Sequence, residues 1–142
     1  MNHNKVVFLD TNVVLDILDP KRPNHAKVIE LWNLLVVKKY TIMISEDMLS
    51  TIFYVNKDKK RTLDFFKMIT KRWQIVSFGK DIIKNAIELS LEKSLDLEDT
   101  LQCLCAKENG CKVFVTNDKK FYDCGISLYT TQEFLKEIDV QR

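Results

Sequence analysis

The chain has 142 residues, of which 46% are hydrophobic and 30% charged, with 3 glycines, 2 prolines and a net charge of +2. These values predict one globular domain over residues 1–142, rich in helix, and exclude low-complexity and strongly basic nucleic-acid-binding chains. No apolar stretch approaches the roughly 20 residues needed to cross a bilayer, and no secretory signal is apparent. We therefore expect a cytoplasmic protein without membrane association.

The N-terminal part of the chain alternates strand-like and helical segments. Residues 5–10 form a mostly β-branched and aromatic run, typical of a strand buried on both faces. Residues 11–18 continue as a short helix. Apolar residues spaced for one face predict a longer helix over 25–39, and 40–44 form a second strand.

Two helices follow in the middle of the chain. Ser45 stands at the N-cap position of a helix over 46–55, whose first turn is acidic, as the helix dipole favours. The next helix covers 58–72. Its periodicity predicts that Leu63, Phe66 and Ile69 or Thr70 lie together on one apolar side.

The C-terminal part repeats the alternation. A strand is predicted over 73–78, a helix over 79–94 and, after Asp96 as its cap, a helix over 97–109. The remaining elements are strands over 112–116 and 127–131 and a helix over 131–138. Short apolar strands that alternate with helices indicate a parallel sheet covered on both faces. We expect an α/β fold, a three-layer α/β/α sandwich around a parallel sheet of about five strands.

A basic run, NKDKKR over 56–61, leads into the predicted helix over 58–72. Such a run usually forms a solvated helix face. It can also contact phosphates, since lysine and arginine side chains attract anionic ligands. The sequence leaves both readings open.

The cysteine pattern argues against a zinc site. No two cysteines form a C-x-x-C pair, and the chain has only two histidines. We expect reduced thiols packed as small apolar groups. The four cysteines are Cys103, Cys105, Cys111 and Cys124.

Acidic residues are predicted to meet at one edge of the sheet. Asp10 ends the first strand, and Asp118 follows the fourth. The helix that leads into the fourth strand begins at the same edge, and its first turn carries Asp96, Glu98 and Asp99. Ligands of open parallel sheets bind beyond the carboxyl ends of the strands. Each of these acids taken alone also suits a cap or a turn.

Carboxylates gathered in this way repel one another unless a cation compensates their charge. Oxygen ligands without histidine or thiolate favour Mg²⁺ or Mn²⁺. A divalent ion lowers the pKa of water and neutralises charge on a phosphoryl oxygen. The pattern therefore indicates metal-assisted hydrolysis of a phosphodiester.

Four segments carry a resemblance to a known family. They read VFLDTNVVLDIL, ISEDMLSTI, SLDLEDTLQCLCA and VFVTNDKKF, and together they span nearly the whole chain. The sequence resembles the PIN domain, a nuclease family that includes the VapC-type toxins of toxin–antitoxin pairs. The resemblance implies an α/β/α fold, an acidic Mg²⁺ or Mn²⁺ site and cleavage of RNA. It also implies an antitoxin protein as partner for a toxin member, and homo-oligomers such as dimers.

The resemblance also assigns roles to individual residues. Asp10, Asp99 and Asp118 match the acids of the family motif and are expected to be catalytic and to bind the metal. Asp96 matches an additional catalytic acid found in some branches. The polar residues that match supporting positions are Thr11, Asn12, Ser45 and Thr116.

The chain departs from the family at one acidic position. Members commonly have a glutamate six residues beyond the serine that follows the second strand, where this chain has Thr51. A hydroxyl lacks the charge of a carboxylate, so we expect at most one tightly held metal, with Glu98 as a substitute ligand from another direction. Asp16, six residues after Asp10, is expected to face away from the site as a surface charge.

Substrate contacts are less defined by the sequence. Lys119 and Lys120 follow Asp118 directly and either contact the RNA backbone or are ordinary loop lysines. Two other functions stay open. One is a PIN-like RNA- or partner-binding module whose site has decayed at Thr51. The other is an aspartyl phosphotransferase, although that chemistry requires a second acid where this chain has Asn12.

Overall fold

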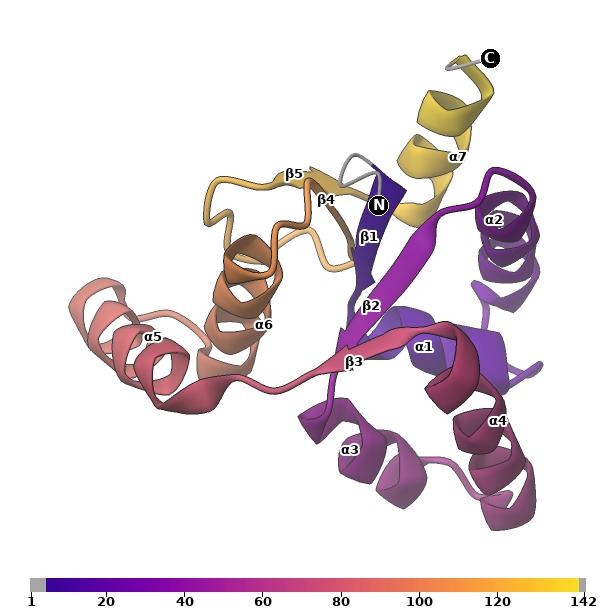
Figure 1. The fold of residues 1–142 in the computed structure, drawn as a ribbon, viewed down its shortest axis with the longest axis horizontal. Helices are drawn as coiled ribbons and strands as arrows, with labels where there is room; N and C mark the ends of the chain where they lie inside the picture. The colour runs from indigo at the N-terminus through magenta and orange to yellow at the C-terminus, as the bar shows by residue number, and fades with distance from the viewer. Residues whose placement is uncertain (1–4, 141–142) are drawn as a thin grey trace.

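Five strands and seven helices alternate along residues 5–140, the part of the chain that the computed structural model describes (Figure 1). The strands are β1 (Val6–Leu9), β2 (Thr41–Ser45), β3 (Gln74–Val76), β4 (Val113–Val115) and β5 (Ser127–Tyr129). The helices are α1 (Thr11–Leu18), α2 (His25–Val37), α3 (Asp47–Val55), α4 (Lys59–Arg72), α5 (Gly79–Lys93), α6 (Leu97–Glu108) and α7 (Thr131–Val140). The predicted order of elements is confirmed.

All five strands are parallel and lie in the order β3-β2-β1-β4-β5. β2 and β3 therefore extend the sheet on one side of β1, and β4 and β5 extend it on the other side. In β1, Leu9 is in register with Val115 of β4, and the Asp10 backbone N–H donates to the Val115 carbonyl at 3.0 Å. The carboxyl ends of β1 and β4 thus meet where the strand order reverses, the position at which open α/β sheets bind ligands.

The helices cover both faces of the sheet. α5 and α6 lie on one side, and α1, α2 and α4 lie on the other (Figure 1). This arrangement confirms the predicted three-layer α/β/α fold. Within residues 5–140, no helix combines the length and the apolar character needed to cross a membrane.

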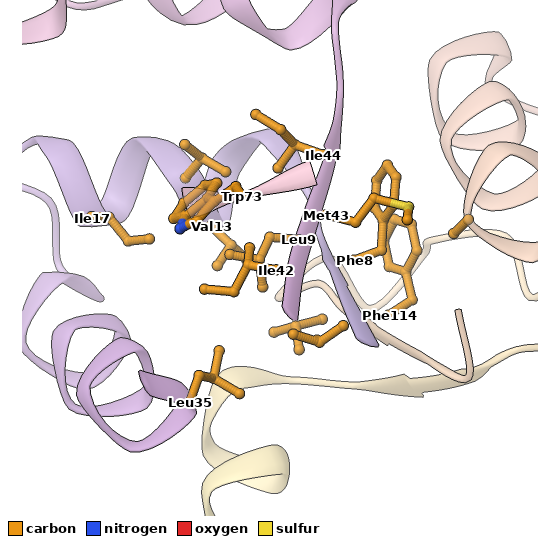
Figure 2. Packing of buried hydrophobic residues seen from close by; sticks show 14 of the residues in the cluster. Phe8, Leu9, Val13, Ile17, Leu35, Ile42, Met43, Ile44, Trp73 and Phe114 are labelled. Atoms are coloured by element: carbon orange, nitrogen blue, oxygen red, sulfur yellow. The ribbon is translucent and has the colours of Figure 1, made fainter. Parts of the chain in front are cut away.

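Successive side chains of each strand point to opposite faces of the sheet, so the hydrophobic core lies on both faces. Leu9 of β1 and Ile42 of β2 point toward the α1 and α2 side, whereas Phe8 and Met43 point to the opposite face (Figure 2). Phe8 stacks on Phe114 of β4 with ring centroids 5.0 Å apart. Apolar side chains on both faces explain why the central strands read as continuous hydrophobic runs.

The predicted apolar side of α4 is buried at Ile69, but the prediction is wrong for Leu63, which is 54% exposed. Phe65 is buried instead and meets Trp32 and Trp73 edge to face, at centroid distances of 6.1 and 5.7 Å. Phe66 is only partly buried against the core. Burial of three aromatic rings outweighs that of one leucine, and this cluster sets the rotation of the helix.

The expectation that all cysteines are reduced is also wrong. A disulfide joins Cys103 of α6 to Cys124 in the segment between β4 and β5. No local pattern predicts this pairing, because two cysteines 21 positions apart meet only through the packing of α6 against that segment. Cys105 and Cys111 are free and buried, as expected, and burial raises the pKa of their thiols to about 11 and about 12.

Candidate active site

Asp10 connects β1 to α1, yet its carboxylate does not cap the helix. Its backbone carbonyl accepts the first helical hydrogen bonds, from the N–H groups of Val13 and Val14, and its side chain makes no capping bond. The carboxylate instead accepts a hydrogen bond of 2.8 Å from Thr116 Oγ1, at the end of β4. Asp10 is 7% exposed. A buried carboxylate that is not needed as a cap is available for chemistry.

Four carboxylates line one cavity of about 240 Å³, which we call the acidic pocket. They come from the end of β1, the first turn of α6 and the loop after β4. The acidic members are Asp10, Glu98, Asp99 and Asp118, and the other lining residues are Thr11, Asn12, Leu15, Arg22, Thr51 and Val55. The structure therefore brings the three acids of the family motif together with a fourth.

The pKa values of two of these carboxyls reflect burial and mutual repulsion. Burial raises the pKa of Asp10 to about 6, the hydrogen bond from Thr116 opposes the rise, and the charges of Glu98 and Asp118 add to it. Burial raises the pKa of Asp99 to about 7, with further contributions from Asp96, Asp10, Asp118 and Glu98. An environment that disfavours anions in this way is one that a cation would stabilise.

Asp96 and Glu98 have distinct positions at the start of α6. Asp96 caps the helix, with its Oδ1 accepting from the Asp99 backbone N–H at 3.0 Å, and it does not line the acidic pocket. Glu98 does line it, and Glu98 Oε1 accepts from Thr11 Oγ1 at 3.4 Å and from Gln102 Nε2 at 3.3 Å. Gln102 also donates to Thr11 Oγ1 at 2.9 Å. These bonds hold the first turn of α6 against α1.

Ser45 is not the N-cap that the sequence predicts. It is the last residue of β2, and Glu46 precedes α3 without a side-chain capping bond. Ser45 Oγ is buried and has no hydrogen-bond partner among residues 5–140. The strand ends one residue later than expected, because Ser45 still pairs with Val76 of β3. Thr51 of α3 does line the acidic pocket, so the family's glutamate position lies at the site.

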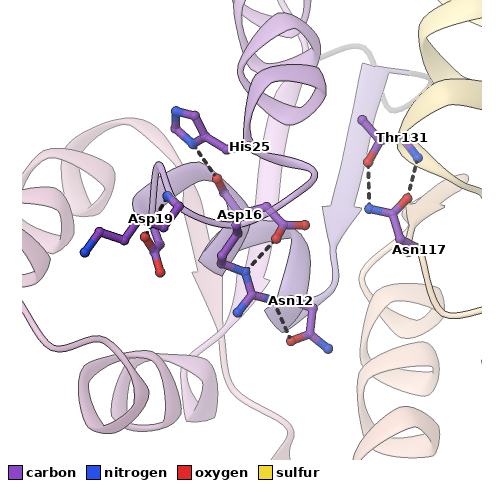
Figure 3. Close-up of polar contacts among 8 residues, drawn as sticks. Asn12, Asp16, Asp19, His25, Asn117 and Thr131 are labelled. Atoms are coloured by element: carbon purple, nitrogen blue, oxygen red, sulfur yellow. Dashed lines mark hydrogen bonds and ion pairs between the residues drawn. The ribbon is translucent and has the colours of Figure 1, made fainter.

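The prediction that Asp16 is a surface charge is wrong. Asp16 is 3% exposed, and its Oδ1 accepts from Arg22 Nε at 2.6 Å in a partly buried ion pair. Arg22 Nη2 also donates to Asn12 Oδ1 at 3.3 Å, and His25 Nδ1 lies 2.7 Å from the Asp16 carbonyl (Figure 3). The turn after α1 folds back over the helix, and this return contact buries Asp16 and brings Arg22 to the acidic pocket.

The loop after β4 is held by its own polar residues. Thr116 Oγ1 accepts from the Asp118 backbone N–H at 3.1 Å. Asn117 pairs twice with Thr131, its Nδ2 donating at 3.0 Å and its Oδ1 accepting at 2.9 Å (Figure 3). Lys119 and Lys120 are exposed, and neither lines the acidic pocket. Their contact with RNA stays a prediction.

The donor set of the acidic pocket fits a hard divalent cation, since it consists of carboxylate oxygens and hydroxyls without thiolate or imidazole. In residues 5–140 no three acidic, histidine or cysteine side chains stand close enough to form a closed metal cluster.

Two contributors to the site escaped the sequence analysis. Arg22 lies in a turn, and nothing in its spacing links it to Asn12 or Asp16. Gln102 lies one turn after Glu98 on α6, and that i, i+4 spacing was the only available signal.

Comparison with known proteins agrees with this fold. A sequence model of the PIN domain matches residues 7–126, and the chain belongs to the PIN domain family. Within that family it is similar to Ribonuclease VapC1 of Aquifex aeolicus (strain VF5), with 41% identity over 138 residues. The alignment covers 94% of this chain and 95% of that protein.

Solved structures share the fold at low sequence identity. Mycobacterium tuberculosis VapC20, a toxin that cleaves the sarcin–ricin loop, matches with a TM-score of 0.69 and 15% identity, covering 84% of this chain and 95% of that one. A toxin–antitoxin complex from Klebsiella pneumoniae matches with a TM-score of 0.67 and 16% identity, covering 88% and 97%. VapBC2 of Rickettsia felis, bound to a promoter DNA fragment, matches with a TM-score of 0.64 and 19% identity, covering 88% and 98%.

Proposed function

We propose that this protein is an endoribonuclease that depends on Mg²⁺ or Mn²⁺ and hydrolyses RNA phosphodiester bonds at the acidic pocket. The observation that carries the proposal is the meeting of Asp10, Asp99 and Asp118 in one cavity, from three distant segments of the chain. The 41% identity to a protein named as a ribonuclease supports RNA as the substrate.

In this proposal Asp10, Asp99 and Asp118 hold the ion. When bound, the ion stabilises negative charge on a phosphoryl oxygen and lowers the pKa of water. The hydroxyl of Thr116 orients Asp10, since its hydrogen bond fixes Oδ2 of that carboxylate. Asp96 acts on the reaction through Asp99, by capping the helix that carries it.

Glu98 is the candidate to accept the proton of the attacking water. Its Oε1 is held by Thr11 and Gln102, which fixes the carboxylate at the wall of the pocket. Both of these hydrogen bonds are made to Oε1, which leaves Oε2 as the atom proposed to take the proton. A general base needs this combination of fixed orientation and one free acceptor.

The proposal extends to partners and location. The toxin–antitoxin relatives support an antitoxin protein as partner. Three apolar side chains spaced four residues apart on α5, Ile83, Ile87 and Leu91, are 42%, 44% and 79% exposed and support a homodimer. With RNA as the substrate, the cytoplasm is the proposed site of action.

A decayed, RNA- or partner-binding module is the second candidate, and Thr51 at the wall of the acidic pocket is the observation that favours it. Glu98 in the same cavity supplies the carboxylate that Thr51 lacks, which favours the active enzyme. An aspartyl phosphotransferase has less support, because Asn12 pairs with Arg22 where that chemistry needs a second acid.

The test is cleavage of mixed RNA by the wild-type protein and by Asp10→Asn, each with Mg²⁺, with Mn²⁺ and with EDTA. We expect cleavage only by the wild type and only with metal. Asp81→Asn on α5, an exposed aspartate outside the pocket, is the matched control and should cleave normally. Cleavage in EDTA, or full activity of Asp10→Asn, would refute the mechanism. Trapping of a phosphoaspartate would favour the phosphotransferase instead.

A further inference from the structure

A second cavity, of about 460 Å³, adjoins the acidic pocket, and we call it the basic cavity. It lies between the end of α1 with the turn that follows and the junction of α3 with α4. Its lining residues are Leu15, Leu18, Asp19, Pro20, Lys21, Arg22, Val55, Asn56, Lys57, Asp58 and Arg61. The two cavities share Leu15, Arg22 and Val55, so one opens beside the other.

The basic cavity has cationic side chains from both of its walls. Lys21 and Arg22 come from the turn after α1, and Lys57 and Arg61 come from the α3–α4 junction. Its two carboxylates are engaged with the backbone. Asp19 Oδ1 accepts from the Lys21 N–H at 2.9 Å, and Asp58 Oδ1 accepts from the Arg61 N–H at 3.1 Å. Four cationic side chains therefore face two carboxylates in this cavity, and the cations are in excess.

The structure divides the basic run of residues 56–61 into two sets. Lys59 donates to backbone carbonyls at the end of α3, including that of Asn56 at 2.8 Å, and Lys60 pairs with Asp64 at 2.7 Å. These two lysines stabilise helix ends and faces. Lys57 and Arg61 instead line the basic cavity. The solvated-face alternative therefore fits Lys59 and Lys60, and contact of Lys57 and Arg61 with phosphates stays a prediction.

Arg22 is held at the boundary between the two cavities. Its Nε is bound by the buried Asp16, and one Nη reaches Asn12, while its side chain remains 30% exposed. Among the residues described as lining the acidic pocket, Arg22 is the only cation. A guanidinium fixed beside four carboxylates can hold a phosphate at their edge, because it offers several donors in a rigid plane.

The floor of the basic cavity is apolar, formed by Leu15, Leu18, Pro20 and Val55. An apolar floor with a cationic rim matches one nucleotide of a single-stranded chain, with the base on the floor and phosphates at the rim. The volume falls within the range of small-ligand sites.

We propose that the basic cavity binds the nucleotide of single-stranded RNA next to the scissile phosphate, with Lys57 and Arg61 contacting its backbone. This inference rests on the proposed function, since it names the part of the substrate that the same site holds. It requires that Arg22, at the shared wall, lies between the bound nucleotide and the acidic pocket.

The experiment measures binding of a fluorescein-labelled single-stranded RNA 12-mer in EDTA, at several salt concentrations. The parent protein is Asp10→Asn, so that the RNA stays intact. Adding Lys57→Ala and Arg61→Ala should reduce the slope of log K against log salt by about 1.4, because each single-strand phosphate contact contributes about 0.7. Affinity at 0.1 M salt should fall roughly 20-fold. Lys67→Ala, an exposed lysine of α4 outside the cavity, should leave the slope unchanged.

A second variant tests the floor. Val55 is 51% exposed, so Val55→Glu can place a charge there without a cost to the core. It should weaken RNA binding, whereas Val37→Glu, the same change at a 71% exposed valine of α2, should not.

An unchanged salt slope in the double variant overturns the inference. A double variant that loses affinity for a partner protein but keeps its affinity for RNA also overturns the inference. The cavity would then be a protein-binding surface. Failure of the proposed function can be distinguished from failure of this inference. Wild-type protein that fails to cleave RNA with Mg²⁺ or Mn²⁺, but shows the cavity-dependent salt slope, would refute the nuclease and support the cavity.

Discussion

Thr116 Oγ1 lies 2.8 Å from Asp10 Oδ2, although the two residues are 106 positions apart in the sequence. Pairing of β1 with β4 brings them together, because each follows a strand end in the same register. The same hydroxyl accepts from the Asp118 backbone N–H at 3.1 Å. One threonine thus connects two of the carboxylates of the acidic pocket.

Replacing Thr116 with valine should move the pKa of Asp10 further above about 6, because the hydrogen bond that opposes the rise is lost. At pH 6.5 more of the Asp10 carboxyl would be protonated and RNA cleavage would fall, with part of the activity recovered at pH 8.5. The measurement is the pH profile of the initial cleavage rate. Thr116→Ser, which keeps the hydroxyl, should follow the wild type. A valine profile that overlays the wild-type profile would contradict the assignment.

The raised pKa values predict that stability without metal falls as pH rises. Asp10, facing Glu98 and Asp118, has a pKa of about 6, and Asp99, facing Asp96 as well, has a pKa of about 7. Both exceed the ordinary value near 4, so between about pH 4 and 7 the folded protein binds more protons than the unfolded chain. Stability is therefore highest near the acidic end of this window and is lost as pH rises through 6 and 7.

The measurement is the free energy of unfolding in EDTA, from urea titrations at pH 5 and pH 7.5. Asp99→Asn should lessen the decrease, because an amide does not ionise. Adding Mg²⁺ at pH 7.5 should restore stability, since an ion that binds only the folded state stabilises it. Stability that rises with pH in EDTA would show that burial and mutual repulsion do not raise the pKa values of these carboxyl groups as described.

The predictions that succeeded rest on local patterns. Asp10 and Asp118 could be assigned to one edge of the sheet because parallel strands share the direction of their carboxyl ends. Asp99 follows from the reversed direction of the connecting helix. Asp96 was recognisable as a cap from its place before α6. These inferences need only the order of elements and the geometry of a parallel sheet.

The features that the sequence did not reveal depend on tertiary distances. Asp16 has the spacing of an exposed helix residue until the turn containing Arg22 folds back over α1. Leu63 has the spacing of a core residue, but the aromatic cluster around Phe65 rotates α4 away from it. Periodicity along one element cannot show which neighbour packs against it.

Arg22→Ala should destabilise the fold by roughly 2–3 kcal/mol, because it leaves the buried Asp16 carboxylate without its cation. The measurement is the urea midpoint at pH 7. Asp16→Asn is the matched control and should cost less, since it removes the buried charge rather than its partner. The double variant, Asp16→Asn with Arg22→Ala, should be more stable than Arg22→Ala alone. Equal midpoints for Arg22→Ala and the wild type would show that the pair contributes nothing.

Reduction of the Cys103–Cys124 disulfide should lower stability by about 3 kcal/mol, because the bond closes a loop across 21 positions in the unfolded chain. The loss should be seen as a lower urea midpoint with dithiothreitol, and Cys103→Ser should lower the midpoint without reductant. Alkylation of the denatured protein should label two thiols before reduction, Cys105 and Cys111, and four afterwards. Four labelled thiols without reductant would mean that the purified protein lacks the bond. Asp118 lies in the segment between β4 and β5 that the bond anchors, so we expect the reduced protein to cleave RNA more slowly. Cys111→Ala, which leaves the bond intact, should cleave RNA at the wild-type rate.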